Sequence, residues 1–250
     1  MEIVDKLSRE LLEQDFSQDG AGSLLERYRS LAASYAELEN ALAVLSDMRS
    51  DSSYIYYGGF ARTLGLSGDG DGSRTGSIWE QEILARIHPD DLRRKMLGEL
   101  SFFRLMSRIP QDRRSRYYLA GALRFRDASG NHVAALHRMF YISLPGQRGI
   151  QFALCLYNPL NFEMKPGCIV VDSYTGRTRT LDAGDSSGLL SAREKEVLLL
   201  IDKGLTSKHI ATMLSISVNT VSRHRQKILA KLKVNNSIEA CRLARELGLL

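Results

Sequence analysis

The chain has 250 residues, and its 34 Lys and Arg against 29 Asp and Glu give a formal net charge of +5. With 44% hydrophobic and 25% charged residues, it has the composition of a globular protein rather than of a disordered polymer. It lacks an apolar run near the roughly 20 residues that span a bilayer. Its three scattered cysteines predict reduced thiols. A secreted, membrane-bound or disulfide-stabilised protein is therefore excluded, and a cytoplasmic protein is expected.

The positive charge is concentrated in the last quarter of the chain. From Ser191 onward there are 11 basic and 5 acidic residues, a net charge of +6, whereas the first 190 residues have 23 basic and 24 acidic residues, a net charge of −1. This asymmetry predicts a compact basic domain that binds a polyanion, joined to a nearly neutral domain.

The first regular pattern is an apolar stripe with alternating steps of four and three residues, which predicts one long helix over residues 24–45. A separate short helix is expected over residues 1–16. The stripe consists of Leu24, Tyr28, Leu31, Tyr35, Leu38, Leu42 and Leu45. Two interpretations stay open: a helix packed on its own domain, or a short parallel coiled coil between two protomers.

The middle of the chain predicts an α+β domain in which strands cluster late. An aromatic strand is expected at Tyr54–Tyr57. A helix is expected to begin at Ile87-His-Pro-Asp-Asp-Leu92, where proline and acidic residues favour a first turn, and to run to about Ser107. Further strands are expected at Tyr117–Arg126, Val133–Leu144 and Ile150–Tyr157, with a last hairpin at Ile169–Leu181.

The early strand Tyr54–Gly59, the Ile87–Leu92 segment and the three closing strands resemble a PAS domain over about residues 52–160. The resemblance implies a PAS-like antiparallel sheet that serves as a sensor or dimerisation module, often with a small pocket between sheet and helices. The cysteine-bearing motif of flavin-binding relatives is absent, and no cofactor is expected. The expected domains are a helical segment (1–50), the PAS-like domain (51–182), a linker (183–188) and a C-terminal all-α domain (189–250).

Residues 189–250 predict four short capped helices. Ser191 with Glu194 forms a capping box, and Gly204 ends the first helix. Thr206, Ser217 and Asn236 are the expected caps of the next three. A tight turn between the second and third helices makes this a helix-turn-helix domain.

The third helix has two unlike faces. At about 100° per residue, Val221, Ile228 and Leu232 fall on one side, which is expected to be buried. The opposite side is polar, basic and almost free of acidic residues, as a helix in the major groove requires. Thr220, His224 and Lys231 lie on one flank, where they could reach backbone oxygens of DNA.

Several strings here resemble the DNA-binding domain of the LuxR/FixJ family over residues 189–247. They are Ser191-Ala-Arg-Glu-Lys-Glu-Val-Leu198, Lys208-His-Ile-Ala211, Ser217-Val-Asn-Thr-Val221, His224 and Lys231-Leu232. The resemblance implies that Ser222, Arg223 and Gln226 read bases, and that Lys208, Thr220, His224 and Lys227 contact the DNA backbone. It also implies that the fourth helix pairs two domains. His209 and Ser222 depart from the family pattern and leave the preferred base sequence open.

No catalytic residue and no metal site is expected. His88, Asp90 and Asp91 fit the start of a helix better than a metal or acid–base cluster. His132 and His137 could face a pocket, although nothing else indicates a haem. An enzyme is the least favoured alternative, and a buried titratable pair within residues 52–160 would be its mark.

The sequence therefore predicts a cytoplasmic, dimeric, sequence-specific transcription regulator that binds double-stranded DNA without contact with a membrane. Other candidate partners are a small-molecule ligand and RNA polymerase. Two roles remain open for the PAS-like domain, whose pocket residues the sequence does not identify. A ligand in a cavity of mixed polar and apolar lining could shift the dimer geometry, or a ligand-free domain with a filled core could act as a scaffold for dimerisation or partner binding.

Overall fold

An antiparallel eight-stranded sheet organises the first part of the described chain. The computed structural model describes residues 2–16, 21–68, 72–144, 146–164, 167–181, 190–232, 234–246 and 250. Two compact units are present, one spanning Val4–Thr180 and the other containing Leu181–Leu250. The expected linker at residues 183–188 lies outside the described residues. The fold class, α+β with an antiparallel sheet followed by an all-α domain, is confirmed.

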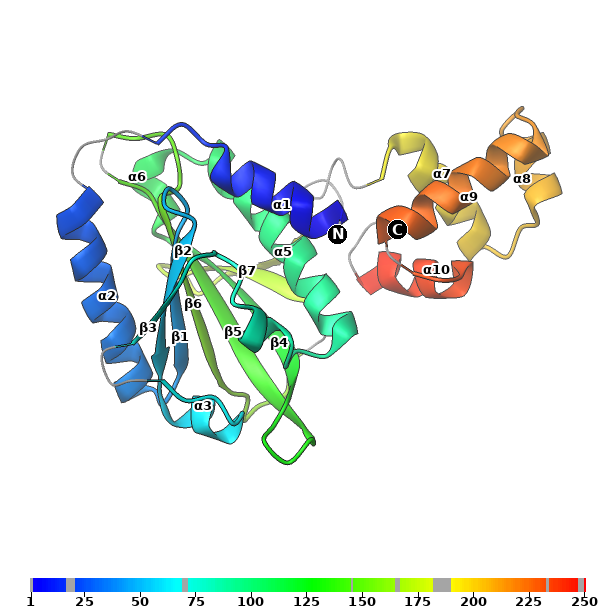
Figure 1. The fold of residues 1–250 in the computed structure, drawn as a ribbon. Helices are drawn as coiled ribbons and strands as arrows, with labels where there is room; N and C mark the ends of the chain where they lie inside the picture. The colour runs from blue at the N-terminus through cyan, green and yellow to red at the C-terminus, as the bar shows by residue number, and fades with distance from the viewer. Residues whose placement is uncertain are drawn as a thin grey trace. The chain divides into compact units, whose positions relative to one another are not determined.

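The elements of the sheet unit follow one another as Figure 1 shows. Its strands are β1 (Leu42–Asp47), β2 (Ser52–Tyr57), β3 (Ser73–Thr75), β4 (Tyr117–Arg126), β5 (His132–Ile142), β6 (Phe152–Pro159), β7 (Cys168–Asp172) and β8 (Thr178–Thr180). They pair in the order β3-β2-β1-β6-β5-β4-β7-β8. Its helices are α1 (Glu2–Leu12), α2 (Ala21–Leu38), α3 (Gly59–Thr63), α4 (Gln81–Leu84), α5 (Pro89–Arg108) and α6 (Gln111–Arg114). The expected strands, the long central helix and the last hairpin are all confirmed, with ends shifted by a few residues.

The prediction of one helix through Leu45 is wrong. Helix α2 ends at Leu38, and Leu42 and Leu45 are fully buried in β1, between β2 and β6. Asn40 has a φ of 51°, a left-handed conformation that Asn tolerates well and that turns the chain out of the helix. Burial in a sheet therefore overrides the helical spacing of these leucines.

Helix α2 packs on the sheet of its own unit, which supports the first of the two interpretations of its apolar stripe. Ala32 and Ala36 are buried against a cluster of β1, β2 and β6 residues, whereas Leu31 is 37% and Leu38 81% exposed. The contact face is thus centred on small residues, and part of the predicted stripe faces away from the sheet.

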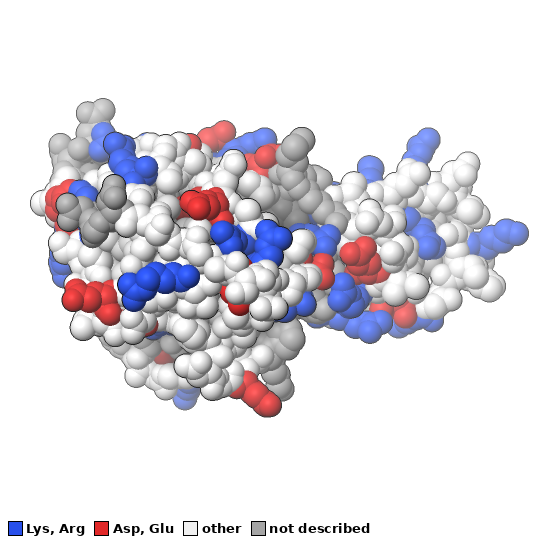
Figure 2. All heavy atoms as spheres, turned by 60° about the horizontal axis from the view of Figure 1, so that its bottom comes forward, with Lys and Arg blue, Asp and Glu red and all other residues white. Residues whose placement is uncertain are grey.

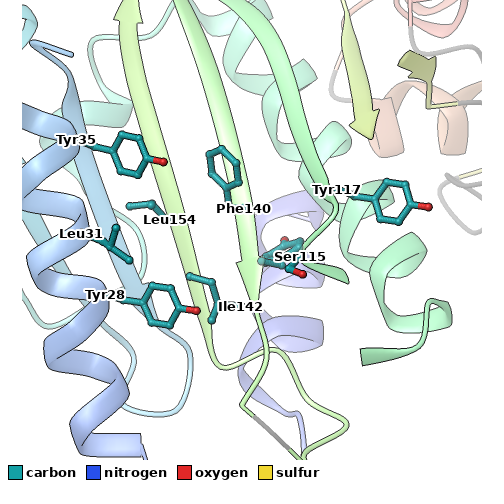
Figure 3. Close-up of a pocket in the computed structure, with 9 residues that line it drawn as sticks. Tyr28, Leu31, Tyr35, Ser115, Tyr117, Phe140, Ile142 and Leu154 are labelled. Carbon is teal, nitrogen blue, oxygen red and sulfur yellow. The ribbon is translucent and has the colours of Figure 1, made fainter. Parts of the chain in front are cut away.

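A groove lies beside α2 on the same face of the sheet (Figure 3). It has a volume of about 190 Å³ and is lined by Tyr28, Leu31, Tyr35, Ser115, Tyr117, Phe140, Tyr141, Ile142 and Leu154. In Figure 3 the side chains of α2 point toward Phe140, Ile142 and Leu154 of the sheet. The groove therefore leaves aromatic and aliphatic surface open next to the helix.

Helices α1 and α5 lie on the opposite side of the sheet from α2 (Figure 1). Leu7 and Leu11 of α1 are buried. Trp79 Nε1 donates to Ser8 Oγ at 2.8 Å, and Arg104 Nε of α5 donates to Glu10 Oε2 at 3.0 Å. These contacts hold α1 against the layer formed by α5 and the segment around Trp79.

The C-terminal unit contains α7 (Ala192–Asp202), α8 (Ser207–Met213), α9 (Val218–Leu232) and α10 (Ser237–Glu246). Its core includes Val197, Ile210, Val221, Ile228 and Leu232, each at most 1% exposed. The predicted buried side of the third helix is thereby confirmed.

Candidate nucleic-acid interface

The four helices of the C-terminal unit start at the predicted caps. Ser191 Oγ accepts from the backbone of Glu194 at 3.2 Å, and Glu194 Oε2 accepts from the Ser191 backbone at 2.7 Å, which completes a capping box. The side chains of Thr206, Ser217 and Asn236 each accept a backbone N–H three residues on. Gly204, at φ 81°, follows the end of α7. Local hydrogen bonding in the sequence therefore sets all four helix starts.

The outward face of α9 is formed by short polar and cationic side chains. Ser222, Arg223 and Gln226, the residues predicted to read bases, are all exposed, one helical turn or less apart. Asn219 and Lys227 are exposed beside them. On the face of the C-terminal unit seen in Figure 2, Lys and Arg side chains predominate over Asp and Glu. The outward face of α9 offers donors for base edges and cations for phosphates.

The predicted backbone-contacting residues differ in their surroundings. Lys208 on α8 and Lys227 on α9 are exposed. Thr220 is half-buried, and its hydroxyl lies 2.9 Å from Ser217 Oγ at the start of α9. His224 is half-buried, and its Nδ1 has no hydrogen-bond partner within the described residues. The two lysines are thus placed to meet phosphates, and the Thr220 hydroxyl already takes part in a helix cap.

Lys231, which was expected on the flank of α9 within reach of DNA backbone oxygens, is engaged in an ion pair within the unit. Its Nζ donates to Glu194 Oε2 at 2.6 Å, so it joins the end of α9 to the capping box of α7. Burial opposes ionisation of Glu194, but hydrogen bonds from Lys231 and Ser191 outweigh burial and lower the pKa of the carboxyl below its usual value. This ion pair stabilises the packing of two helices and takes Lys231 out of the set of free cations.

Arg225 lies in the candidate interface, and its structural role was not evident from the sequence. It is half-buried and donates to Ser207 Oγ at 3.1 Å and to Ser237 Oγ at 2.9 Å. It therefore ties α9 to the starts of both α8 and α10. The helical periodicity places it next to the polar face, and only the three-dimensional contacts show that it points inward.

The cluster at His88, Asp90 and Asp91 has a structural role. His88 Nδ1 accepts from the Asp90 backbone at 3.3 Å at the start of α5. Asp91 is 1% exposed and accepts from the backbone and from Nε of Arg124, at 2.7 and 2.9 Å. Burial opposes ionisation of Asp91, but the bonds from Arg124 dominate and lower its pKa. These residues join α5 to β4.

A buried polar cluster lies on the inner side of the sheet, the face that α1 and α5 cover. Lys95 Nζ donates to Glu99 Oε1 at 2.6 Å, and both side chains are 4% exposed. Glu80 Oε1 accepts from Ser53 Oγ at 2.5 Å, and burial raises the pKa of Glu80. A cavity of about 30 Å³, with mixed polar and apolar lining, lies next to Lys95 and Glu99.

This cluster bears on the alternatives for the first unit. The buried pair Lys95–Glu99 is the feature that the sequence analysis named as the mark of an enzyme. The mixed lining fits a sensor, but about 30 Å³ is room for one or two water molecules rather than for an organic ligand. Of the two candidate pocket histidines, His137 is 1% exposed on the inner face and His132 is exposed.

Comparison with known proteins identifies the C-terminal unit. The family of bacterial regulatory proteins, luxR family, matches residues 188–244. The response regulatory protein YgeK of Escherichia coli is 43% identical over 63 residues, 25% of this chain and 43% of that protein. The transcriptional regulatory protein DesR of Bacillus subtilis is 48% identical over 59 residues, 24% of this chain and 30% of that protein. The chain spans less than half the length of these relatives, and its C-terminal unit is a LuxR-family helix-turn-helix domain.

A structural comparison extends over more of the chain at lower similarity. The Vibrio cholerae VqmA dimer, determined in the absence of target DNA, shares 17% identity over 90% of this chain and 88% of that chain, with a TM-score of 0.34. That TM-score is too low to establish a shared fold. Within the described residues, no helix is both long and apolar enough to cross a bilayer.

Proposed function

We propose that this chain, through its LuxR-family domain, is a sequence-specific DNA-binding regulator of transcription that acts in the cytoplasm. Helix α9 enters the major groove, where Ser222, Arg223 and Gln226 meet base edges. Lys208 and Lys227 contact phosphates and supply an affinity that depends on salt. His224 and Thr220 approach the backbone from the flank of α9.

The observation that carries this proposal is the division of α9 into two faces. Val221, Ile228 and Leu232 are buried in the core, while Ser222, Arg223 and Gln226 are exposed together. A helix whose exposed side were only solvated would not need this concentration of guanidinium and amide groups beside two exposed lysines. The net charge of +6 from Ser191 onward agrees with a polyanionic partner.

We further propose that the regulator is a homodimer on a near-palindromic site with half-sites about one helical turn apart. Ile238 on α10 is 85% exposed, and an exposed aliphatic side chain on this helix suits contact with a second copy. The groove beside α2 and the exposed Leu31 and Leu38 offer apolar surface on the other unit. Contact with RNA polymerase would follow once the dimer is bound at a promoter.

For the sheet unit, the proposed role is that of a PAS-like sensory module rather than an enzyme. The buried pair Lys95–Glu99 is joined by its own hydrogen bond, and the cavity of about 30 Å³ beside it is too small for an organic substrate. The alternative is a ligand-free scaffold for dimerisation or partner binding, and the small size of this cavity is compatible with that role as well. A constitutive scaffold would leave DNA affinity unchanged in cell extracts depleted of small molecules, whereas a sensor would not.

Replacement of Arg223 by alanine tests the DNA-binding proposal. A duplex is first selected by the full-length protein from a random-sequence library. Arg223→Ala is expected to weaken specific binding by about 1–3 kcal/mol and to relax the base preference at one position of each half-site. Arg9→Ala, at an exposed position of α1, changes the net charge equally and should leave binding unchanged. Failure of the library to yield a preferred sequence, or wild-type affinity of Arg223→Ala, would contradict the proposed base-reading face.

A further inference from the structure

Three side chains of metal-ligand type converge inside the sheet unit. Glu99 comes from α5, His137 from β5 and Cys155 from β6. One ligand atom of each lies within 4.8 Å of the others, and all three residues are buried. Strands β5 and β6 are direct neighbours, with Met139 paired to Cys155, so the sheet register itself brings the imidazole and the thiol together. The three groups are therefore held by rigid elements rather than by loops.

The imidazole of His137 is oriented but incompletely bonded. Its ring stacks on Tyr157, with ring centres 4.9 Å apart and planes at 17°. Its Nε2 lies 3.7 Å from Glu99 Oε1 and has no hydrogen-bond partner among the described residues. A buried polar atom without a hydrogen-bond partner is energetically unfavourable.

We propose that Glu99, His137 and Cys155 form a binding site for one divalent transition-metal ion of the zinc type. Carboxylate, imidazole and thiolate are the ligands that zinc takes in proteins, and three of them leave a fourth position open. Bond lengths of about 2.0–2.3 Å hold tetrahedral ligand atoms roughly 3.3–3.8 Å apart. The His137–Glu99 distance already falls in this range, and the remaining closure is about 1 Å of side-chain movement.

Lys95 is the apparent obstacle to a cation at this position, because its ammonium is bonded to Glu99. A carboxylate has about four acceptor positions, so Glu99 can accept from Lys95 and bind an ion at the same time. Coordination by Cys155 requires its thiol proton to leave for solvent. The charge of the ion would then be balanced by the Glu99 carboxylate and the Cys155 thiolate. Glu80 lines the same cavity as Lys95 and could balance the charge of its ammonium.

The open fourth position would face the small cavity. The cavity of about 30 Å³ is lined in part by Glu99, Cys155 and Lys95, with Leu11 of α1 on its border. One water molecule fits there and would complete a tetrahedral shell. The size of the cavity thus suits an ion and its water better than an organic molecule. An occupied site would tie α5 to the two central strands β5 and β6.

Titration with Co²⁺ tests the site directly. The full-length protein is stripped with a chelator, and Co²⁺ is added under reducing conditions while the absorption spectrum is followed. We expect one equivalent to bind and to give the charge-transfer band of a cobalt–thiolate bond. Cys155→Ser should abolish that band, whereas Cys168→Ser and Cys241→Ser, at the two other cysteines, should retain it. Glu99→Gln and His137→Gln should each weaken Co²⁺ binding by at least about tenfold, the usual minimum effect of even an outer-shell change.

The wild-type spectrum alone can overturn the proposal, so the test does not depend on variants that fold. Absence of a thiolate band in stripped, reduced wild-type protein would refute the site. A band that survives in Cys155→Ser but disappears in Cys168→Ser or Cys241→Ser would refute the assignment of its ligands. In addition, Zn²⁺ should raise the unfolding midpoint reported by Trp79 fluorescence in the wild type, and no change in that midpoint at saturating Zn²⁺ would also count against the site.

Discussion

The charged side chains that bear on the proposals for the two units lie in opposite environments. In the C-terminal unit, Arg223, Lys208 and Lys227 are exposed, and the polar face of α9 is left open to solvent. In the sheet unit, Lys95 and Glu99 are buried on the inner side of the sheet together with His137. Exposed charges are solvated by water and are available to a partner, whereas buried charges are stable only when they are paired.

This contrast indicates how each unit would carry out its proposed role. A surface of exposed cations and amides can meet a macromolecule such as DNA without any change in the fold. A buried set of ionisable groups can only respond to something small that enters the interior. Under the proposed function, regulation by the sheet unit would therefore begin inside it, and DNA recognition would take place at the surface of α9.

Replacement of Lys95 in the sheet unit is expected to change stability more than any other substitution proposed for either unit. Lys95→Met would leave Glu99 buried without its ammonium partner and should lower the free energy of unfolding by about 3–5 kcal/mol. The chain has a single tryptophan, Trp79, which lies in the sheet unit. Urea unfolding followed by its fluorescence therefore measures this unit selectively.

The matched control removes both charges of the pair. Lys95→Met combined with Glu99→Met should regain most of the lost stability, because replacement of both partners by apolar groups is often nearly neutral. If the double variant is no more stable than Lys95→Met alone, Lys95 acts through its packing and not through its charge.

In the C-terminal unit, the ion pair Lys231–Glu194 is expected to contribute less to the free energy of unfolding than Lys95–Glu99 does, and this contribution depends on pH. The pKa of Glu194 is lowered in the folded state, so its contribution is complete above the unfolded value of about 4.3 and is lost as the pH falls through the lower folded value. Glu194→Gln retains the cap geometry but not the charge, and should cost about 1 kcal/mol at neutral pH.

Urea unfolding followed by far-UV circular dichroism at pH 7 and pH 4 measures this effect, with Trp79 fluorescence separating the transition of the sheet unit. The difference between wild type and Glu194→Gln should shrink at the lower pH. Lys231→Met should show the same behaviour, because it removes the other half of the pair. An equal difference at both pH values would show that the charge of Glu194 does not contribute.

The same contrast explains which features the sequence could predict. The helix starts at Ser191, Thr206 and Ser217 depend on residues three positions apart, so the sequence alone predicted them correctly. The interior cluster depends on residues 99, 137 and 155, which only the strand pairing and the packing of α5 bring together. No spacing in the sequence indicates such a site, and the sequence analysis accordingly expected no metal.

Local periodicity also failed where tertiary burial was stronger. Leu42 and Leu45 continue a helical spacing, yet they lie in β1. This strand pairs with β2 and β6 in the interior of the sheet, where both leucine side chains are fully buried. Similarly, Arg225 and Lys231 lie beside the polar face of α9, and their partners on α7, α8 and α10 draw them inward. Sequence patterns therefore predict the buried and exposed faces of a helix. Tertiary contacts determine where the helix ends and which residues at the edge of its polar face point inward.

The smallest expected effect separates positioning from base recognition on α9. Lys227 is exposed beside the base-reading residues and is proposed to contact a phosphate. Lys227→Ala should weaken binding to the selected duplex and to a scrambled duplex by the same factor, because phosphates carry no sequence information. The slope of log affinity against log salt concentration should decrease by about 0.9, the value for one ionic contact. Lys203→Ala, which removes an exposed charge beyond the end of α7, should leave that slope unchanged. A loss confined to the selected duplex would instead assign Lys227 to base recognition, and would enlarge the reading face beyond Ser222, Arg223 and Gln226.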